Sequence, residues 1–94
     1  MQIDALRDEV SRIDRDIIGL IAKRQLLAGQ IARVKVTEGI PIHDHARVHE
    51  VLEYVFDTAV EEKIDPVAVQ KVFEVLIAMS EERQRECTGD GNLP

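Results

Sequence analysis

The sequence has little of what marks secreted, membrane-spanning or aromatic-rich proteins. Its 94 residues include one cysteine, no tryptophan and three aromatic side chains. A single cysteine, Cys87, excludes an internal disulfide and is typical of a reducing compartment. No apolar run approaches the roughly 20 residues that a membrane span requires, and the first residues contain no signal-peptide core. We therefore expect a cytoplasmic protein that does not associate with a membrane.

Composition favours one small helical domain. Hydrophobic residues make up 45% of the chain and charged residues 32%, and the formal net charge is −6. This balance is typical of a soluble globular chain, and the scarcity of aromatics predicts an aliphatic core. The negative charge argues against nucleic acid as a partner. An anionic ligand would need a local cationic pocket that acts against the overall charge.

An apolar ladder predicts one very long first helix over about residues 3–38. Its members recur at steps of three and four residues, apart from one gap: Ile3, Leu6, Val10, Ile13, Ile17, Leu20, Leu27, Ile31 and Val34. Gly39 and Pro41 predict the end of this helix. At 1.5 Å per residue it is about 54 Å long, whereas a compact chain of this size has a radius of gyration of about 12 Å. A second copy of the chain is the simplest cover for the ladder, so we expect a homodimer.

Two further helices follow, and no segment has the pattern of a strand. Asp44 is a suitable N-cap for a helix over about residues 45–61. The pair Asp65-Pro66 predicts the start of a third helix over about residues 66–87. We expect an all-α domain over residues 1–87 and a disordered tail over residues 88–94, which are rich in glycine and polar residues.

Polar side chains interrupt the apolar faces of two helices. Arg24 occupies the gap between Leu20 and Leu27, where a buried cation costs several kcal/mol unless an anion meets it. Lys35 lies three turns further along the same face, about 16 Å along the axis and about 20° around it. Ser80 and Gln84 continue the apolar face of the third helix. These four side chains predict a polar chamber for a compact dianion that also carries neutral oxygens.

Simpler interpretations exist for some of these residues. Lys35 and Gln84 can lie at solvated helix ends, and Ser80 can bond a backbone carbonyl. His45 and His49 are one helical turn apart, but without a third histidine or a cysteine nearby we expect no zinc site. The sequence also lacks a Ser–His–acid set and a phosphate-binding glycine loop. We expect no metal and no cofactor.

An ordered set of motifs resembles the all-helical class of chorismate mutases. The resemblance extends from residue 3 to about residue 86 without gaps, and the motifs are Leu6-Arg7-Asp-Glu-Val-Ser-Arg-Ile-Asp14, Ala22-Lys-Arg24, Lys35, Ile40-Pro-Ile-His-Asp44-x-x-Arg47, Ile64-Asp65, Phe73 and Ser80-x-x-x-Gln84. It implies an intertwined homodimer, a six-helix bundle with two equivalent active sites. The implied reaction converts chorismate to prephenate on the route to phenylalanine and tyrosine.

The resemblance also implies roles for individual residues. Arg24 binds one substrate carboxylate, and Arg7 binds the other from the partner subunit. Lys35 and Gln84 hydrogen-bond the ether oxygen of the breaking bond, and Ser80 lies near the ring carboxylate. Arg7 and Arg24 are about 25 Å apart along one straight helix, so they cannot meet on one small ligand in the same chain.

The start of the second helix departs from the family pattern. Asp44 and Arg47 match positions around the substrate hydroxyl, but the glutamate that usually follows the arginine is Val48 here. Asp44 would then bind the hydroxyl alone, or water or backbone would bind it. The departure leaves open a related branch of the fold, the isochorismate pyruvate lyases, which form salicylate. A second alternative is a non-catalytic dimerisation module whose polar layer sets helix register.

Overall fold

The computed structural model describes residues 1–88, which form three helices and no strand. These are α1 (Gln2–Glu38), α2 (His45–Glu61) and α3 (Pro66–Cys87). The predicted all-α class is confirmed, and the helix ranges agree with the expected ones to within one residue. The predicted tail lies outside the described residues from residue 89 onward. Within residues 1–88, no helix is long and apolar enough to cross a membrane.

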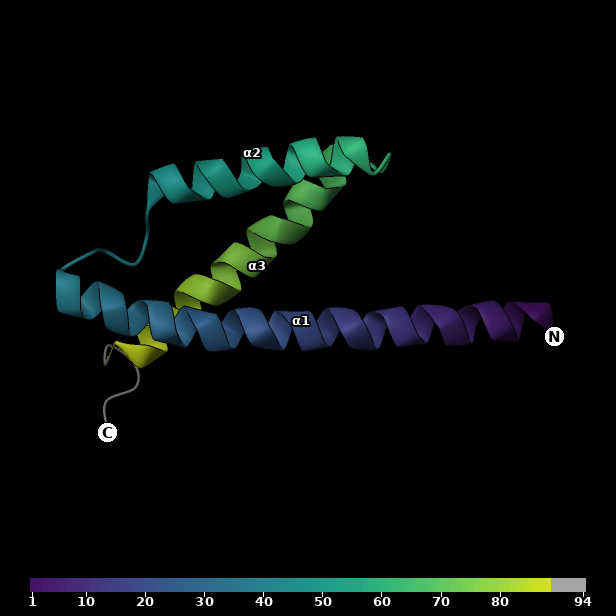
Figure 1. The fold of residues 1–94 in the computed structure, drawn as a ribbon, viewed down its shortest axis with the longest axis horizontal. Helices are drawn as coiled ribbons and strands as arrows, with labels where there is room; N and C mark the ends of the chain where they lie inside the picture. Colours follow the sequence, from purple (N-terminus) through teal and green to yellow (C-terminus); the bar gives the residue numbers. More distant parts are fainter. Residues whose placement is uncertain (89–94) are drawn as a thin grey trace.

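The chain is an elongated frame in which α3 joins the other two helices. Figure 1 shows α1 as a straight rod, α2 on the other side of a gap, and α3 running obliquely between them. α3 contacts both neighbours, whereas α1 and α2 do not contact each other. The longest dimension is 54 Å and the radius of gyration is 16.5 Å. The second value exceeds the roughly 12 Å of a compact chain of this length, so one chain alone does not form a compact globule.

Local chemistry explains where the helices begin and end. Gly39 closes α1 in the left-handed conformation with φ 70°, and the Ile40 amide donates to the Lys35 carbonyl at 2.8 Å. Asp44 caps α2, since its Oδ1 accepts from the Arg47 amide at 3.1 Å. Asp65 caps α3 in the same way, with Pro66 in the first turn. The predicted caps are therefore confirmed.

Small side chains, rather than the apolar ladder, form the contact between α1 and α3. Ala28, Gly29 and Ala32 are the buried residues of α1. A Cβ placed on Gly29 would lie 3.4 Å from the Cys87 Sγ, so α3 approaches the α1 backbone closely here. The nine ladder residues all remain exposed, from 46% for Ile3 and Ile31 to 60% for Leu20. The long apolar face of α1 therefore has no cover within its own chain.

Candidate active site

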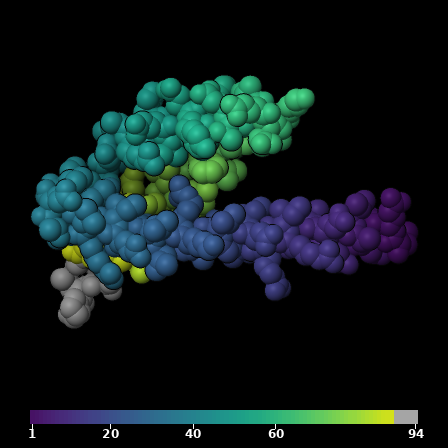
Figure 2. Space-filling model, viewed as in Figure 1, coloured from purple at the N-terminus to yellow at the C-terminus, as the bar shows by residue number. Residues whose placement is uncertain are grey.

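A cavity of about 400 Å³ lies where α1, α2, α3 and the α1–α2 connection meet. Figure 2 shows the hollow between α1 and α2, with α3 behind it. Polar side chains from every surrounding element line it: Arg24 and Lys35 from α1, Asp44 from the connection, Arg47 from α2, and Ser80, Glu81 and Gln84 from α3. Seven of the eight predicted site residues, Val48 included, therefore line one cavity. The eighth, Arg7, does not.

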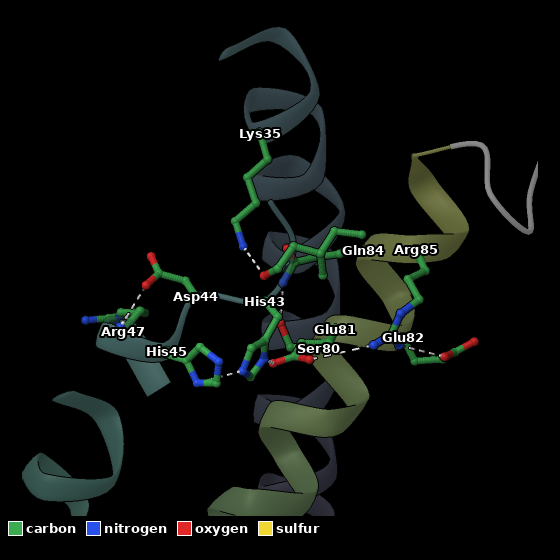
Figure 3. A network of polar contacts seen from close by, with 11 residues as sticks. Lys35, His43, Asp44, His45, Arg47, Ser80, Glu81, Glu82, Gln84 and Arg85 are labelled. Atoms are coloured by element: carbon green, nitrogen blue, oxygen red, sulfur yellow. Dashed lines mark hydrogen bonds and ion pairs between the residues drawn. The ribbon is translucent and has the colours of Figure 1, made fainter. Parts of the chain in front are cut away.

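Lys35 brings its ammonium group to the α1–α2 connection. Its Nζ donates to the backbone carbonyl of Ile42 at 2.7 Å (Figure 3). The side chain is half-buried, and no carboxylate of residues 1–88 pairs with it. An ammonium group carries three donors, so Lys35 can keep this bond and still donate to a ligand.

Arg24 lies in the interior of the frame without an anionic partner. Its guanidinium donates weakly to the Leu76 carbonyl at 3.5 Å and lies 5.7 Å from the centroid of the Phe73 ring. Neither group neutralises the charge, and among the described residues no carboxylate does. The cation that interrupts the apolar ladder therefore lines the cavity with its charge uncompensated.

Gln84 is the most deeply buried polar residue of the cavity wall, with 5% of its surface exposed. Its Nε2 donates to the Ser80 Oγ at 3.1 Å, whereas its Oε1 is buried without a partner. A buried polar atom without a hydrogen bond costs about 1–3 kcal/mol. Turning the amide over would let the Ser80 hydroxyl donate to Oε1 and place the NH₂ group where Oε1 now lies. In either orientation the amide has hydrogen-bonding capacity left for a ligand.

The first turn of α2 offers the cavity fewer unpaired polar groups than its sequence suggests. The Asp44 Oδ1 is occupied in capping α2, and the Arg47 guanidinium lies 3.5 Å from the exposed Glu50 carboxylate. Val48 is half-buried and adds an apolar surface at the position where the resemblance leads one to expect a glutamate. This corner of the cavity therefore offers one free carboxylate oxygen, from Asp44.

Glu81 is a cavity residue that the sequence analysis missed. Its side chain is only 15% exposed, and its carboxylate bonds the His43 Nδ1 at 2.9 Å and approaches the Arg85 guanidinium at 3.7 Å (Figure 3). The signal was present, because Glu81 follows Ile77 by four residues and precedes Gln84 by three, which places all three on one helix face. A second carboxylate therefore lines a cavity that is otherwise suited to anions.

The histidines of the connection and of α2 are engaged with other side chains. The His45 Nδ1 lies 3.2 Å from the His43 Nε2, and the His49 Nε2 lies 3.1 Å from the Glu53 carboxylate. Within residues 1–88, no three His, Cys, Asp or Glu side chains are grouped so that they could hold a metal ion.

Comparison with known proteins agrees with these features. A family model described as chorismate mutase type II matches residues 6–85, which is most of the chain. The chain belongs to this family. A chorismate mutase of Methanocaldococcus jannaschii is 31% identical over 81 residues, which are 86% of this chain and 82% of that protein.

Other relatives in the chorismate mutase family are longer. Bifunctional chorismate mutase/prephenate dehydratases of Enterobacter agglomerans and Escherichia coli K12 are 32% and 26% identical over 73 residues, or 78% of this chain. The chain spans about a fifth of the length of these bifunctional relatives, 19% in each case. The matched family and these relatives support a chorismate mutase, and they do not favour the isochorismate pyruvate lyase alternative.

A single chain of this chorismate mutase family member leaves Arg7 far from the cavity. Arg7 is exposed on the half of α1 that projects away from α2 and α3 (Figure 1). A second cavity, of about 310 Å³, opens between α2 and α3 and shares Arg24, Arg47 and Val51 with the first. The remaining walls of this second cavity are mainly apolar. The two cavities therefore lie side by side, with Arg24 at the boundary.

Proposed function

We propose that this chain converts chorismate to prephenate in the 400 Å³ cavity. The observation that supports this most strongly is a pair of half-buried cations, Arg24 and Lys35, that line one cavity and have no carboxylate partner among the described residues. In a chain of net charge −6, such cations are suited to a small dianion. The amide of Gln84, which has an unpaired buried oxygen, supplies the neutral hydrogen-bonding group.

The proposed reaction is a pericyclic rearrangement without a covalent intermediate or proton transfer. The protein holds the substrate in a compact reactive conformation and stabilises the charge that develops in the transition state. Arg24 binds a carboxylate with its planar guanidinium. Lys35 and the NH₂ group of Gln84 donate to the ether oxygen, which becomes more negative as its bond to carbon breaks. Ser80 binds the ring carboxylate, and Asp44 binds the hydroxyl.

We further propose that the active form is a homodimer in which Arg7 completes the site of its partner. Two features support this: the apolar ladder of α1 is exposed along its whole length, and the second cavity beside Arg24 is open and mainly apolar. The projecting half of a partner's α1 offers an apolar surface that could cover this open, apolar cavity. Such a helix would also carry Arg7 towards Arg24, where a substrate has two carboxylates to bind.

Replacing Lys35 with alanine tests the proposed site. We expect kcat for prephenate formation to fall about 100-fold, as it does when one donor to a developing negative charge is removed. Lys71→Ala removes an exposed lysine of α3 and serves as the matched control, with kcat within twofold of the wild type. A change of less than threefold in Lys35→Ala contradicts the assigned role. An isochorismate-to-salicylate assay run beside it tests the lyase activity directly.

A further inference from the structure

The connection between α1 and α2 has one side-chain tie to α3. Residues 39–44 form this connection, and Ile42 and Asp44 within it line the 400 Å³ cavity. Among the described residues, the hydrogen bond between His43 and Glu81 is the only one that joins the connection to α3. Since α1 and α2 do not contact each other, this bond helps to hold the connection against the third wall of the cavity.

The geometry of this bond indicates which of its two atoms carries the proton. A carboxylate only accepts hydrogen bonds, so the His43 Nδ1 carries the proton that it donates to the Glu81 Oε2 at 2.9 Å. The His43 Nε2 lies 3.2 Å from the His45 Nδ1, and the two rings meet edge to face. Arg85 approaches the other Glu81 oxygen at 3.7 Å. The Glu81 side chain is 15% exposed and the His43 side chain 46%, so the carboxylate end of the bond is better shielded from water than the imidazole end.

We propose that His43 and Glu81 are positioning residues that clasp the α1–α2 connection to α3 and so place two groups of the active site. The first is the Lys35 ammonium, which donates to the carbonyl of Ile42, the neighbour of His43. The second is Asp44, the other neighbour of His43. Figure 3 shows the clasp and the Lys35 bond side by side. This inference rests on the proposed function, because it concerns the same site and the same reaction.

The clasp also limits the effect of a negative charge on the cavity wall. Glu81 is a carboxylate in a cavity that we propose binds a dianion, and like charges at short range repel each other. His43 donates a hydrogen bond to one of its oxygens, so that oxygen already has a partner. Losing His43 therefore weakens substrate binding in two ways. The connection has to be ordered when the substrate binds, and Glu81 repels the substrate more strongly.

Steady-state kinetics of His43→Ala test the clasp. We expect KM for chorismate to rise about tenfold, with kcat within threefold of the wild type, because bound substrate reorders the connection. His49→Ala is the matched control, since it removes a histidine–glutamate pair of similar length, 3.1 Å, on the exposed face of α2. Its KM should stay within twofold. A fall in kcat at unchanged KM in His43→Ala overturns the clasp.

A double-mutant cycle separates the clasp from a direct role of Glu81. In a Glu81→Ala background, adding His43→Ala should change KM less than twofold, because the bond is already lost. The exchanged pair, His43→Glu with Glu81→His, restores an acid and an imidazole at the two positions and should bring KM back to within threefold of the wild type. If His43→Ala raises KM equally in both backgrounds, the clasp is wrong.

A spectroscopic measurement distinguishes failure of the clasp from failure of the proposed function. Nitrogen-15 spectra of the histidine rings report which nitrogen carries the proton, and the hydrogen bond of a ring sets this tautomer. We expect His43 to be protonated at Nδ1, and we expect Glu81→Ala to reduce that tautomer while Glu53→Ala leaves it unchanged. An unchanged tautomer in Glu81→Ala overturns the clasp even if prephenate forms. A wild-type protein that forms no prephenate overturns the proposed function, whatever the tautomer.

Discussion

At the scale of single residues, the cavity contains groups that are poorly satisfied in the isolated chain. The Arg24 guanidinium has a carbonyl oxygen at 3.5 Å and an aromatic ring as partners. A cation in the interior needs an anion, and neither group supplies one. Gln84 has a buried oxygen without a donor. Such groups lower stability in the absence of a ligand and contribute to binding once a ligand is present. Stability and activity should therefore respond in opposite directions when one of them is made apolar.

Gln84→Leu tests this opposition. Leucine has a similar volume and no polar atom, so the unfolding free energy of the ligand-free protein should rise by about 1 kcal/mol. Activity should fall about 100-fold, because a donor to the ether oxygen is lost. Thermal or urea unfolding and the prephenate assay measure the two effects. Gln70→Leu is the control: that amide already donates to the Leu52 carbonyl at 2.9 Å, so it should give no gain in stability. If Gln84→Leu is both active and less stable, the amide has a structural role.

At the scale of helices, the α2–α3 junction contains the one non-glycine residue of positive φ in the described chain. Lys63 has φ 62°, and the Ile64 amide donates to the Ala59 carbonyl at 3.1 Å, the bond pattern that Gly39 and Ile40 make at the end of α1. An L-residue in this left-handed conformation costs about 1–2 kcal/mol. The two helix ends thus use the same closure, once with glycine and once with lysine.

Lys63→Gly should therefore stabilise the protein. We expect the unfolding free energy to rise by about 0.5–1 kcal/mol, since the relief of strain is partly offset by the greater freedom of glycine in the unfolded chain. Lys63→Ala removes the same charge but keeps a Cβ, so it should give no gain. Chemical denaturation at fixed protein concentration measures both. A glycine variant no more stable than the alanine variant would show that the junction is not strained.

Local sequence rules predicted the helices well because the signals that end a helix are themselves local. Gly39, Asp44 and Asp65 each act on backbone groups within five residues, so their effect could be read without knowledge of the fold. The hydrogen bond between His43 and Glu81 joins residues 38 apart and depends on where the connection comes to lie. No local pattern encodes that placement, and the clasp was therefore not predicted.

The packing of α1 was predicted only in part for a related reason. The ladder of large apolar side chains dominates the sequence of α1, and it correctly indicated a surface too long for one chain to cover. Within the chain, however, α3 packs on Ala28, Gly29 and Ala32, because small side chains allow two helices to approach closely. Helix geometry was enough to predict that the polar residues at three- and four-residue spacing share a helix face. The face of α1 on which α3 packs could not be predicted in this way.

At the scale of the whole molecule, the proposed dimer predicts complementation between inactive variants. Arg7→Ala and Arg24→Ala should each lose activity in a homodimer, since every site then lacks one carboxylate-binding arginine. A mixed dimer has one site with both arginines and one with neither. Refolding an equimolar mixture should therefore recover about a quarter of the wild-type activity if the chains pair at random.

Two outcomes would contradict this arrangement. A refolded mixture that stays inactive means that the two arginines do not act across the interface. Full activity in Arg7→Ala alone means that Arg7 is not part of the site. Mixing each variant with an Arg7→Ala/Arg24→Ala chain controls for the refolding procedure, because neither combination contains an intact site.

The exposed ladder of α1 has a consequence for how activity depends on the amount of protein. Suppose that a partner's helix covers the ladder and completes each site. Dissociation then exposes the ladder to solvent and removes the partner's arginine from the site in the same event. Association then contributes to the unfolding free energy by mass action, so the melting temperature rises with concentration. Specific activity should likewise fall on dilution below the dissociation constant. Cellular abundance would then act as a control on catalysis that needs no effector and no additional site.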